Sequence, residues 1–218
     1  MHDRRDRARS LIRGLYAITD AELMPELDFV TRAEAALRGG ARILQYRDKS
    51  ADIEKRQRQA IGLLSVCIRH GATLVINDDV LLARRIGAPA VHLGQGDMSI
   101  QDARAVLGPE VLIGVSCHNS LELAIKAQLA GADYLAFGAF HASSTKPEAV
   151  IAAPELLHSA RRQLSLPLVA IGGVTPENGG FLLRAGADAL AVVSGVFGAQ
   201  EDIETAARRF ARLFSSHA

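Results

Sequence analysis

Short apolar runs and segments of helical periodicity alternate along most of this 218-residue chain. Each apolar run is too short for a helix and ends in polar or glycine-rich residues, as buried parallel strands do where they leave the core. The alternation therefore predicts parallel strands joined by crossover helices. The predicted strands are 15–19, 41–46, the apolar part of 74–80, 90–93, 111–115, 133–137, 167–171 and 188–193.

Helical patterns fill the segments between these runs, and five of them end at a Gly-Ala pair, where glycine supplies a left-handed cap. Eight strand-helix units in a chain of this length favour an α/β fold of the closed (β/α)8 type, the TIM barrel. A doubly wound open sheet is the alternative. The predicted helices are 27–37, 53–68, 80–86, 100–107, 121–129, 154–163, 177–184 and 203–214, with Asn119 and Glu122 as a capping box for the fifth.

One domain is expected, because 218 residues with 49% hydrophobic composition are enough for a single large core. We place this barrel domain at residues 14–218. Residues 1–13 carry several arginines and two aspartates but no apolar segment. We therefore expect a flexible basic N-terminal tail there, not a secretory signal.

The charge balance gives no reason to expect nucleic acid or a membrane surface as a partner. Lys and Arg number 25 against 24 Asp and Glu, for a formal net charge of +1. No apolar run approaches the roughly 18 residues that a membrane span needs. The cysteines, Cys67 and Cys117, have no metal-ligand spacing and fit a reducing compartment as small buried side chains. We expect a cytoplasmic protein with small-molecule substrates.

Polar residues follow the predicted strands at their carboxyl ends, which form the functional site in either fold. Asp78 and Asp97 end the third and fourth strands, which are neighbours in a barrel. Magnesium takes one or two protein carboxylates together with water and phosphate oxygens, so this pair suits Mg²⁺. Two surface turn aspartates are the alternative, with Asn77-Asp78-Asp79 forming a turn or a helix N-cap.

Other strand ends favour a phosphorylated substrate. Gly172-Gly173 and Ser194-Gly195 follow the seventh and eighth strands, where such barrels bind phosphate through backbone N–H groups, although tight turns would use the same residues. Arg47, Lys49 and Lys146 lie just past the second and sixth strands and would neutralise an anionic leaving group. Magnesium and three cations together indicate a diphosphate.

Eight short motifs occur in order between about residues 14 and 200. They are Tyr16-Ala17-Ile18-Thr19-Asp20, Gln45-Tyr46-Arg47-Asp48-Lys49, Asn77-Asp78-Asp79, Val91 through Asp97, Gly114-Val115-Ser116, Gly138 through Pro147, Ile171-Gly172-Gly173-Val174 and Ala191-Val192-Val193-Ser194. Together they closely resemble the thiamine phosphate synthase family. The resemblance implies a single-domain barrel that joins 4-amino-2-methyl-5-pyrimidinylmethyl diphosphate to thiazole phosphate, giving thiamine phosphate and diphosphate.

The resemblance also implies roles for individual residues. Asp78 and Asp97 would bind Mg²⁺. The pyrimidine diphosphate would be held by Gln45, Tyr46, Arg47, Asp48, Lys49, Asn77, Ser116 and Lys146, and the thiazole phosphate by Ser143, Ser144, Thr145, Gly173, Val193 and Ser194. Arg47, Lys49, Ser116 and Lys146 would be the catalytic set. In the implied dissociative mechanism the bond to diphosphate breaks first, and the thiazole nitrogen then captures a pyrimidine carbocation.

One stretch departs from the family pattern. Where the family usually reads Gly-Pro-Ile-Phe-Pro-Thr, residues 138–143 read Gly-Ala-Phe-His-Ala-Ser. The loop has lost both prolines, so ordering it over a substrate is expected to cost more conformational entropy. Ser143 keeps the hydroxyl group of the threonine that it replaces, and substrate binding is expected to survive.

Two other functions fit parts of the pattern. A thiazole tautomerase-like barrel would use a histidine such as His118 and no magnesium, which leaves Asp78 and Asp97 without a role. A non-catalytic barrel that binds a phosphorylated ligand would need only the glycines. A single histidine at a strand end is more often a structural hydrogen-bonding residue. No proton-transfer role is therefore assigned to His92, His118 or His141.

Overall fold

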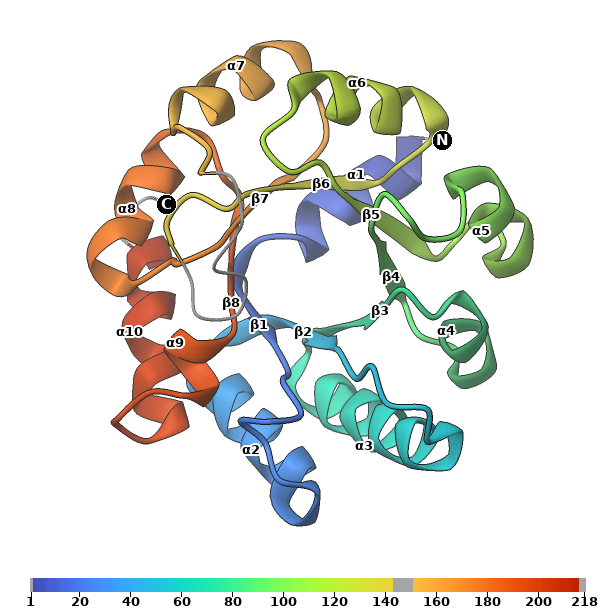
Figure 1. Ribbon diagram of the computed structural model, residues 1–218, viewed down its shortest axis with the longest axis vertical. Coiled ribbons are helices and arrows are strands. Elements are labelled where there is room, and N and C mark those ends of the chain that lie inside the picture. The colour runs from blue at the N-terminus through green and yellow to red at the C-terminus, as the bar shows by residue number, and fades with distance from the viewer. Residues whose placement is uncertain (1, 143–150, 216–218) are drawn as a thin grey trace.

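The computed structural model describes residues 2–142 and 151–215. Its centre is a closed barrel of parallel strands in chain order, surrounded by helices (Figure 1). The strands are β1 (Gly14–Ile18), β2 (Ala41–Tyr46), β3 (Thr73–Asn77), β4 (Ala90–Leu93), β5 (Leu112–Ser116), β6 (Tyr134–Phe137), β7 (Leu168–Ile171) and β8 (Ala189–Val192). Each strand pairs with the next, and β1 closes the ring by pairing with β8. The predicted (β/α)8 barrel is confirmed.

Helices surround the barrel, and all but the first of them follow a strand in the chain (Figure 1). They are α1 (His2–Leu11), η1 (Glu26–Asp28), α2 (Phe29–Arg38), α3 (Ile53–His70), α4 (Val80–Ile86), α5 (Ile100–Leu107), α6 (Leu121–Ala130), α7 (Glu155–Gln163), α8 (Pro176–Arg184), α9 (Ser194–Phe197) and α10 (Ile203–Ser215). Of these, α1, η1 and α9 were not expected. None of the helices described here has both the length and the apolar character required to cross a bilayer.

The helix ends follow local chemistry. The glycine of each Gly-Ala pair has a positive φ, as expected for a left-handed cap. The predicted capping box of α6 is wrong, because the N-cap is Ser120, whose hydroxyl accepts from the backbone N–H of Leu123 at 3.2 Å. The helix starts at Leu121, one residue too late for Asn119 to reach its first N–H groups.

Successive side chains of each strand point to opposite faces and so build two apolar layers. One layer fills the barrel interior, with Tyr16, Ile43, Val75, Leu112 and Tyr134 among its members. The other lies between the strands and the helices. This alternation decides which side chain of a strand can reach the interior and which is held against a helix.

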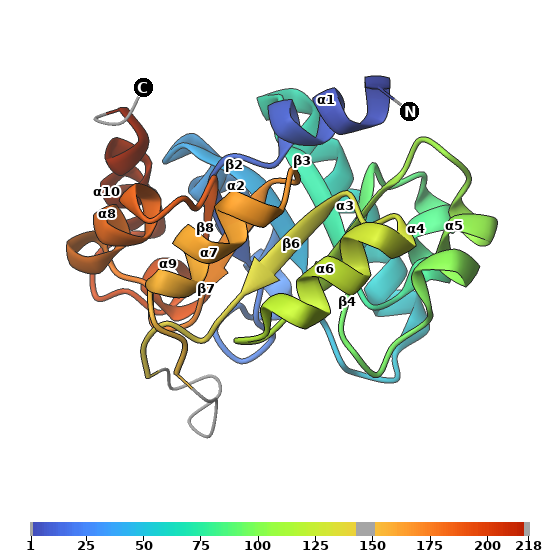
Figure 2. The same ribbon diagram turned by 90° about the horizontal axis from the view of Figure 1, so that it is seen from above.

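The N-terminal segment is an ordered helix, so the expectation of a flexible tail at residues 1–13 is wrong. Helix α1 lies across one end of the barrel (Figure 2). Ala8 and Ile12 are fully buried against the interior layer. Two buried side chains at an (i, i+4) spacing are enough to hold one face of a short helix.

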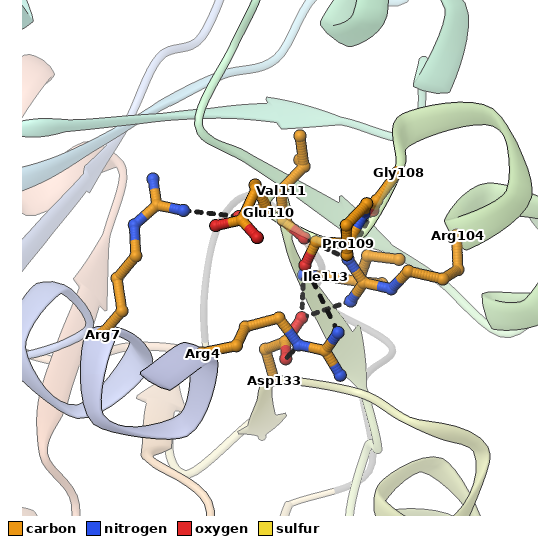
Figure 3. A network of polar contacts seen from close by, with 9 residues as sticks. All are labelled: Arg4, Arg7, Arg104, Gly108, Pro109, Glu110, Val111, Ile113 and Asp133. Carbon is orange, nitrogen blue, oxygen red and sulfur yellow. Dashed lines mark hydrogen bonds and ion pairs between the residues drawn. The ribbon is translucent and has the colours of Figure 1, made fainter. Parts of the chain in front are cut away.

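Charged groups fix α1 to the end at which the strands begin (Figure 3). Asp133, next to β6 and only 2% exposed, accepts from Arg4 at 2.7 Å and from Arg104 of α5 at 2.6 Å. It also accepts the backbone N–H of Ile113 at 2.8 Å. Arg7 donates to the carbonyl of Glu110. Arg4 and Arg7 therefore hold α1 over the end of the barrel at which the strands begin. The predicted site lies at the opposite end, where the strands end.

Candidate active site

The carboxyl ends of the strands surround a cavity of about 210 Å³, to which every strand contributes at least one side chain. Its walls hold the amide groups of Gln45 and Asn77 and the hydroxyl of Ser116. Seven of the residues expected to contact substrate line this cavity: Gln45, Arg47, Asn77, Ser116, Gly173, Val193 and Ser194. Strands that are far apart in sequence are thus brought together at one place.

The two predicted magnesium ligands lie beside each other, next to the cavity. Asn77 lines the cavity and donates from Nδ2 to Asp78 Oδ2 at 2.7 Å. Asp78 has a φ of 60°, in the left-handed region that aspartate tolerates better than most residues. The backbone N–H of Gly94 donates to Asp97 Oδ2 at 2.7 Å and fixes the second carboxylate. These contacts hold both acids at the ends of neighbouring strands β3 and β4.

The proximity of these carboxylates affects their electrostatics. Hydrogen bonding to Asp78, followed by burial, raises the pKa of Asp97 above its ordinary value. Two carboxylates this close repel each other unless a proton or a cation lies with them. Magnesium commonly takes two carboxylates from a protein and the rest of its ligands from water and phosphate. The donor set therefore fits Mg²⁺, although the described residues contain no cluster of three or more His, Cys, Asp or Glu side chains suited to a metal.

Cations lie beside the same acids. Lys49 forms an ion pair with Asp78 Oδ2. Arg47 lines the cavity, and its backbone N–H donates to Thr19 Oγ1 at 2.9 Å, which ties the loop after β2 to the end of β1. Both residues follow β2, as predicted, and of the two Lys49 contacts the Asp78 carboxylate while Arg47 lines the cavity.

Asp79 differs from its neighbour Asp78. It caps α4 by accepting the backbone N–H of Leu82 at 2.8 Å, and it forms an ion pair with Arg56 of α3. The alternative reading of Asn77-Asp78-Asp79 as a helix cap is thus correct for Asp79. The adjacent acids thus have different roles: Asp78 follows the end of β3, and Asp79 caps the start of α4.

Tyr46 and Asp48 do not reach the cavity, although both were expected to hold the pyrimidine diphosphate. Tyr46 is buried on the outer side of β2, where its hydroxyl donates to Gln59 Oε1 at 2.9 Å. Asp48 accepts from the Ser50 N–H at 2.6 Å and forms an ion pair with Lys55 Nζ at 2.9 Å. Burial alone would raise the pKa of Asp48, but these bonds outweigh it and lower the pKa. Asp48 thus shapes the loop that presents Arg47 and Lys49, whereas Tyr46 ties β2 to α3.

Backbone groups dominate the side of the cavity formed by β7 and β8. Gly172 and Gly173 have φ values of 98° and 58°, and a Cβ at Gly173 would lie 2.5 Å from the carbonyl oxygen of Ala142. Glycine is therefore required where the loop after β6 crosses this turn. Helix α9 begins at Ser194, and the first N–H groups of a helix lack partners within it. Exposed N–H groups at these places suit an anionic group.

Four expected site residues, Ser143, Ser144, Thr145 and Lys146, lie outside the described residues. The part of their loop that is described is held against the end of β7. The N–H of Phe140 donates to the carbonyl of Ile171 at 3.2 Å, and that of His141 donates to Gly172 at 3.0 Å. The first residues of the stretch that departs from the family pattern are therefore held beside the cavity by backbone hydrogen bonds to the end of β7.

Sequence reasoning missed the polar side chains beneath the cavity. Tyr16 and His92 line it, and they connect with Tyr134 in the barrel interior. The hydroxyls of Tyr16 and Tyr134 are 3.1 Å apart, and His92 contacts both Tyr134 Oη at 3.1 Å and Ser116 Oγ at 2.9 Å. A signal was available for His92. It alternates with Val91 and Leu93, two apolar residues of the outer layer, so it had to face inward.

The chain is similar in sequence to known proteins. The family model described as thiamine monophosphate synthase matches residues 15–196. A thiamine-phosphate synthase of Acidithiobacillus ferrooxidans is 56% identical over 209 residues, which are 94% of this chain and 96% of that protein. One from Thioalkalivibrio sulfidiphilus is 55% identical over 203 residues, or 93% and 96% of the two chains.

Solved structures agree with these sequence matches. A thiamine phosphate pyrophosphorylase from Pyrococcus furiosus superposes with a TM-score of 0.86 at 32% identity, covering 96% of this chain and 98% of that one. A thiamine phosphate pyrophosphorylase from Bacteroides thetaiotaomicron has a TM-score of 0.69 at 17% identity, which shows the shared fold alone. The match to the first structure extends over nearly the whole of both chains.

Proposed function

Because the chain belongs to the thiamine monophosphate synthase family and is a transferase that makes thiamine phosphate, we propose that the cavity described above is where its two precursors react. The pyrimidine diphosphate lies toward β2, β3 and β5, and the thiazole phosphate lies toward β7 and β8. The proposal includes one Mg²⁺ ion held by Asp78 and Asp97.

The pairing of Asp78 with Asp97 beside Lys49 is the observation that carries this proposal. A diphosphate is a poor leaving group unless its developing charge is neutralised. Two acids that can hold a divalent cation, next to a lysine and near Arg47, form a place where that neutralisation can occur.

When bound, magnesium would act as a Lewis acid on the diphosphate oxygens. Arg47 and Lys49 bind the same group and hold it against the β2 side of the cavity. Gln45, Asn77 and Ser116 provide the polar contacts that orient the pyrimidine ring. This orientation presents the methylene carbon to the other half of the cavity, where the second substrate lies.

The thiazole phosphate is held by backbone groups. Gly173, Val193 and Ser194 line the cavity at the β7 turn and at the start of α9, and the backbone N–H groups of such places can bind an anionic group. The expected contacts from residues 143–145 would add hydroxyl groups to this set. With its phosphate fixed here, the thiazole ring extends toward the pyrimidine.

The proposed reaction requires positioning and charge stabilisation. The carbon–oxygen bond to diphosphate breaks, and its electron pair leaves with the diphosphate. The thiazole nitrogen then donates its lone pair to the resulting carbocation and forms the new carbon–nitrogen bond. No proton is transferred in these two steps, so the residues that matter are those that bind the leaving group and align the two rings.

The test is to mix the purified protein with both precursors, with and without magnesium, and to follow thiamine phosphate by chromatography. Product that forms only with magnesium and stops forming when a chelator is added is the expected result. Equal product formation in excess chelator would contradict the metal assignment. Isomerisation of a thiazole precursor alone, without coupling, would favour the tautomerase reading instead.

A further inference from the structure

A chain of hydrogen bonds crosses the barrel beneath the cavity. It runs from Gln45 of β2 through Tyr16 of β1, Tyr134 of β6 and His92 of β4 to Ser116 of β5. Its two ends, Gln45 and Ser116, both line the cavity. The chain therefore joins two groups that face the substrate from different strands.

The two tyrosines of this hydrogen-bond chain are buried, with Tyr16 at the wall of the cavity and Tyr134 in the barrel interior. Tyr16 is 1% exposed and Tyr134 is fully buried. Gly114 makes room for the Tyr134 ring, since a Cβ at that position would lie 1.9 Å from the ring. Burial raises the pKa of both tyrosines above the ordinary value, so both hydroxyls keep their protons at neutral pH. Each hydroxyl must then find an acceptor for its proton within the barrel.

The orientation of the Gln45 amide decides which partner donates in each hydrogen bond that follows. Its Nε2 donates to Tyr16 Oη at 2.7 Å, so Tyr16 passes its own proton on to Tyr134. Tyr134 in turn donates to His92 Nδ1. A neutral imidazole that accepts at Nδ1 carries its proton on Nε2, and Nε2 contacts Ser116 Oγ at 2.9 Å.

The opposite direction leaves a buried donor without an acceptor. A proton on His92 Nδ1 would be donated to Tyr134, and Tyr134 would donate to Tyr16. Tyr16 Oη would then receive protons from both Gln45 and Tyr134. Its own proton would have no further acceptor in the part of the barrel that is described, and buried donors in this state are costly. The direction from Gln45 to Ser116 pairs every donor.

We propose that Tyr134 is a positioning residue, which acts through His92 to hold the Ser116 hydroxyl as a hydrogen-bond donor toward the bound substrate. Because His92 Nε2–H is donated to Ser116 Oγ, the proton of Ser116 is left to point into the cavity. The substrate atom that Ser116 meets is then an acceptor, such as a ring nitrogen, and not an amino group. This inference rests on the proposed function, in which the pyrimidine lies beside Ser116.

The test uses Tyr134→Phe in the full chain, which removes the hydroxyl and keeps the ring. The ¹⁵N resonances of His92, assigned by comparison with His92→Gln, report which ring nitrogen carries the proton without any substrate. In the wild-type protein the His92 proton should be on Nε2. In Tyr134→Phe it should no longer be confined to that nitrogen. In the coupling assay, kcat/KM for the pyrimidine diphosphate should fall about tenfold, the effect of losing one buried hydrogen bond. KM for the thiazole phosphate should not change.

Tyr46→Phe is the matched control. Tyr46 is also buried and loses one hydrogen bond, but that bond lies on the outer side of β2. The Tyr46→Phe variant should keep wild-type kinetics, and its His92 should carry the proton on Nε2. A wild-type His92 protonated on Nδ1 would overturn the proposal even if Tyr134→Phe failed to fold. Kinetics of Tyr134→Phe equal to those of Tyr46→Phe would also overturn it, whereas a wild-type protein that makes no thiamine phosphate would refute the proposed function.

Discussion

At the scale of single residues, the two cysteines illustrate how burial controls chemistry. Cys67 and Cys117 are at most 1% exposed. Burial raises the pKa of each thiol to about 12, so at pH 8 only about one molecule in ten thousand carries the reactive thiolate. Both residues behave as small apolar side chains, as expected from the sequence.

We predict that a thiol reagent at pH 8 labels neither cysteine in the folded protein. Both should react at once after denaturation in urea, which supplies the stoichiometric control of two thiols per chain. Absorbance of the released chromophore measures the reaction. Rapid labelling of one thiol in the folded protein would show that its surroundings open more readily than the packing implies.

Single residues also show how far strand periodicity can be trusted. Gln45 and Tyr46 are adjacent on β2, so only one of them can face the cavity. Family resemblance assigned both to the substrate, whereas the alternation of the strand allowed one. The same rule would have identified His92 as an inward-facing residue. The loop residue Asp48 follows no such rule, because its direction depends on Ser50 and Lys55.

At the scale of elements, regular units were predictable and short or irregular ones were not. Helices α4 and α5 begin and end where the sequence predicted, since aspartate or serine caps their starts and glycine follows their ends. Strands β2 and β4 also have the predicted bounds. Helix α1 was missed because Ala8 is the one fully buried residue among its described side chains and Ile12 follows directly after the helix, which is too few apolar residues to give a helical pattern. Its stability depends on tertiary ion pairs, which sequence spacing does not show.

A pair of neighbouring arginines tests the role of α1. Arg4→Ala removes one of the two guanidinium groups on the buried Asp133 carboxylate, so we predict a loss of about 1.5–3 kcal/mol in the free energy of unfolding. Arg5 is exposed, and Arg5→Ala should change stability by less than about 0.5 kcal/mol. Urea denaturation of the two variants beside the wild type gives the comparison. Equal stabilities would mean that the Arg4 contact contributes nothing in solution.

At the scale of the whole molecule, closure of the barrel creates the site. The acids come from two consecutive units, and the backbone proposed to bind phosphate comes from the last two, so no single stretch of sequence contains the cavity. Strand ends could be predicted to meet because parallel strands in a barrel share one carboxyl edge. Which side chains touch there could not be predicted, because the contacts between Asp78, Asp97 and Lys49 depend on how each chain segment turns after its strand.

The magnesium dependence of turnover in Asp97→Asn, measured beside Asp79→Asn, is the most direct test of this site. Asp79 is the matched control, since it pairs with Arg56 and caps α4. We predict that Asp97→Asn lowers the rate of thiamine phosphate formation by about a hundredfold or more, since metal stabilisation of the leaving group is worth several kcal/mol. Asp79→Asn should keep the wild-type magnesium response. Wild-type turnover by folded Asp97→Asn at every magnesium concentration would contradict the proposed site.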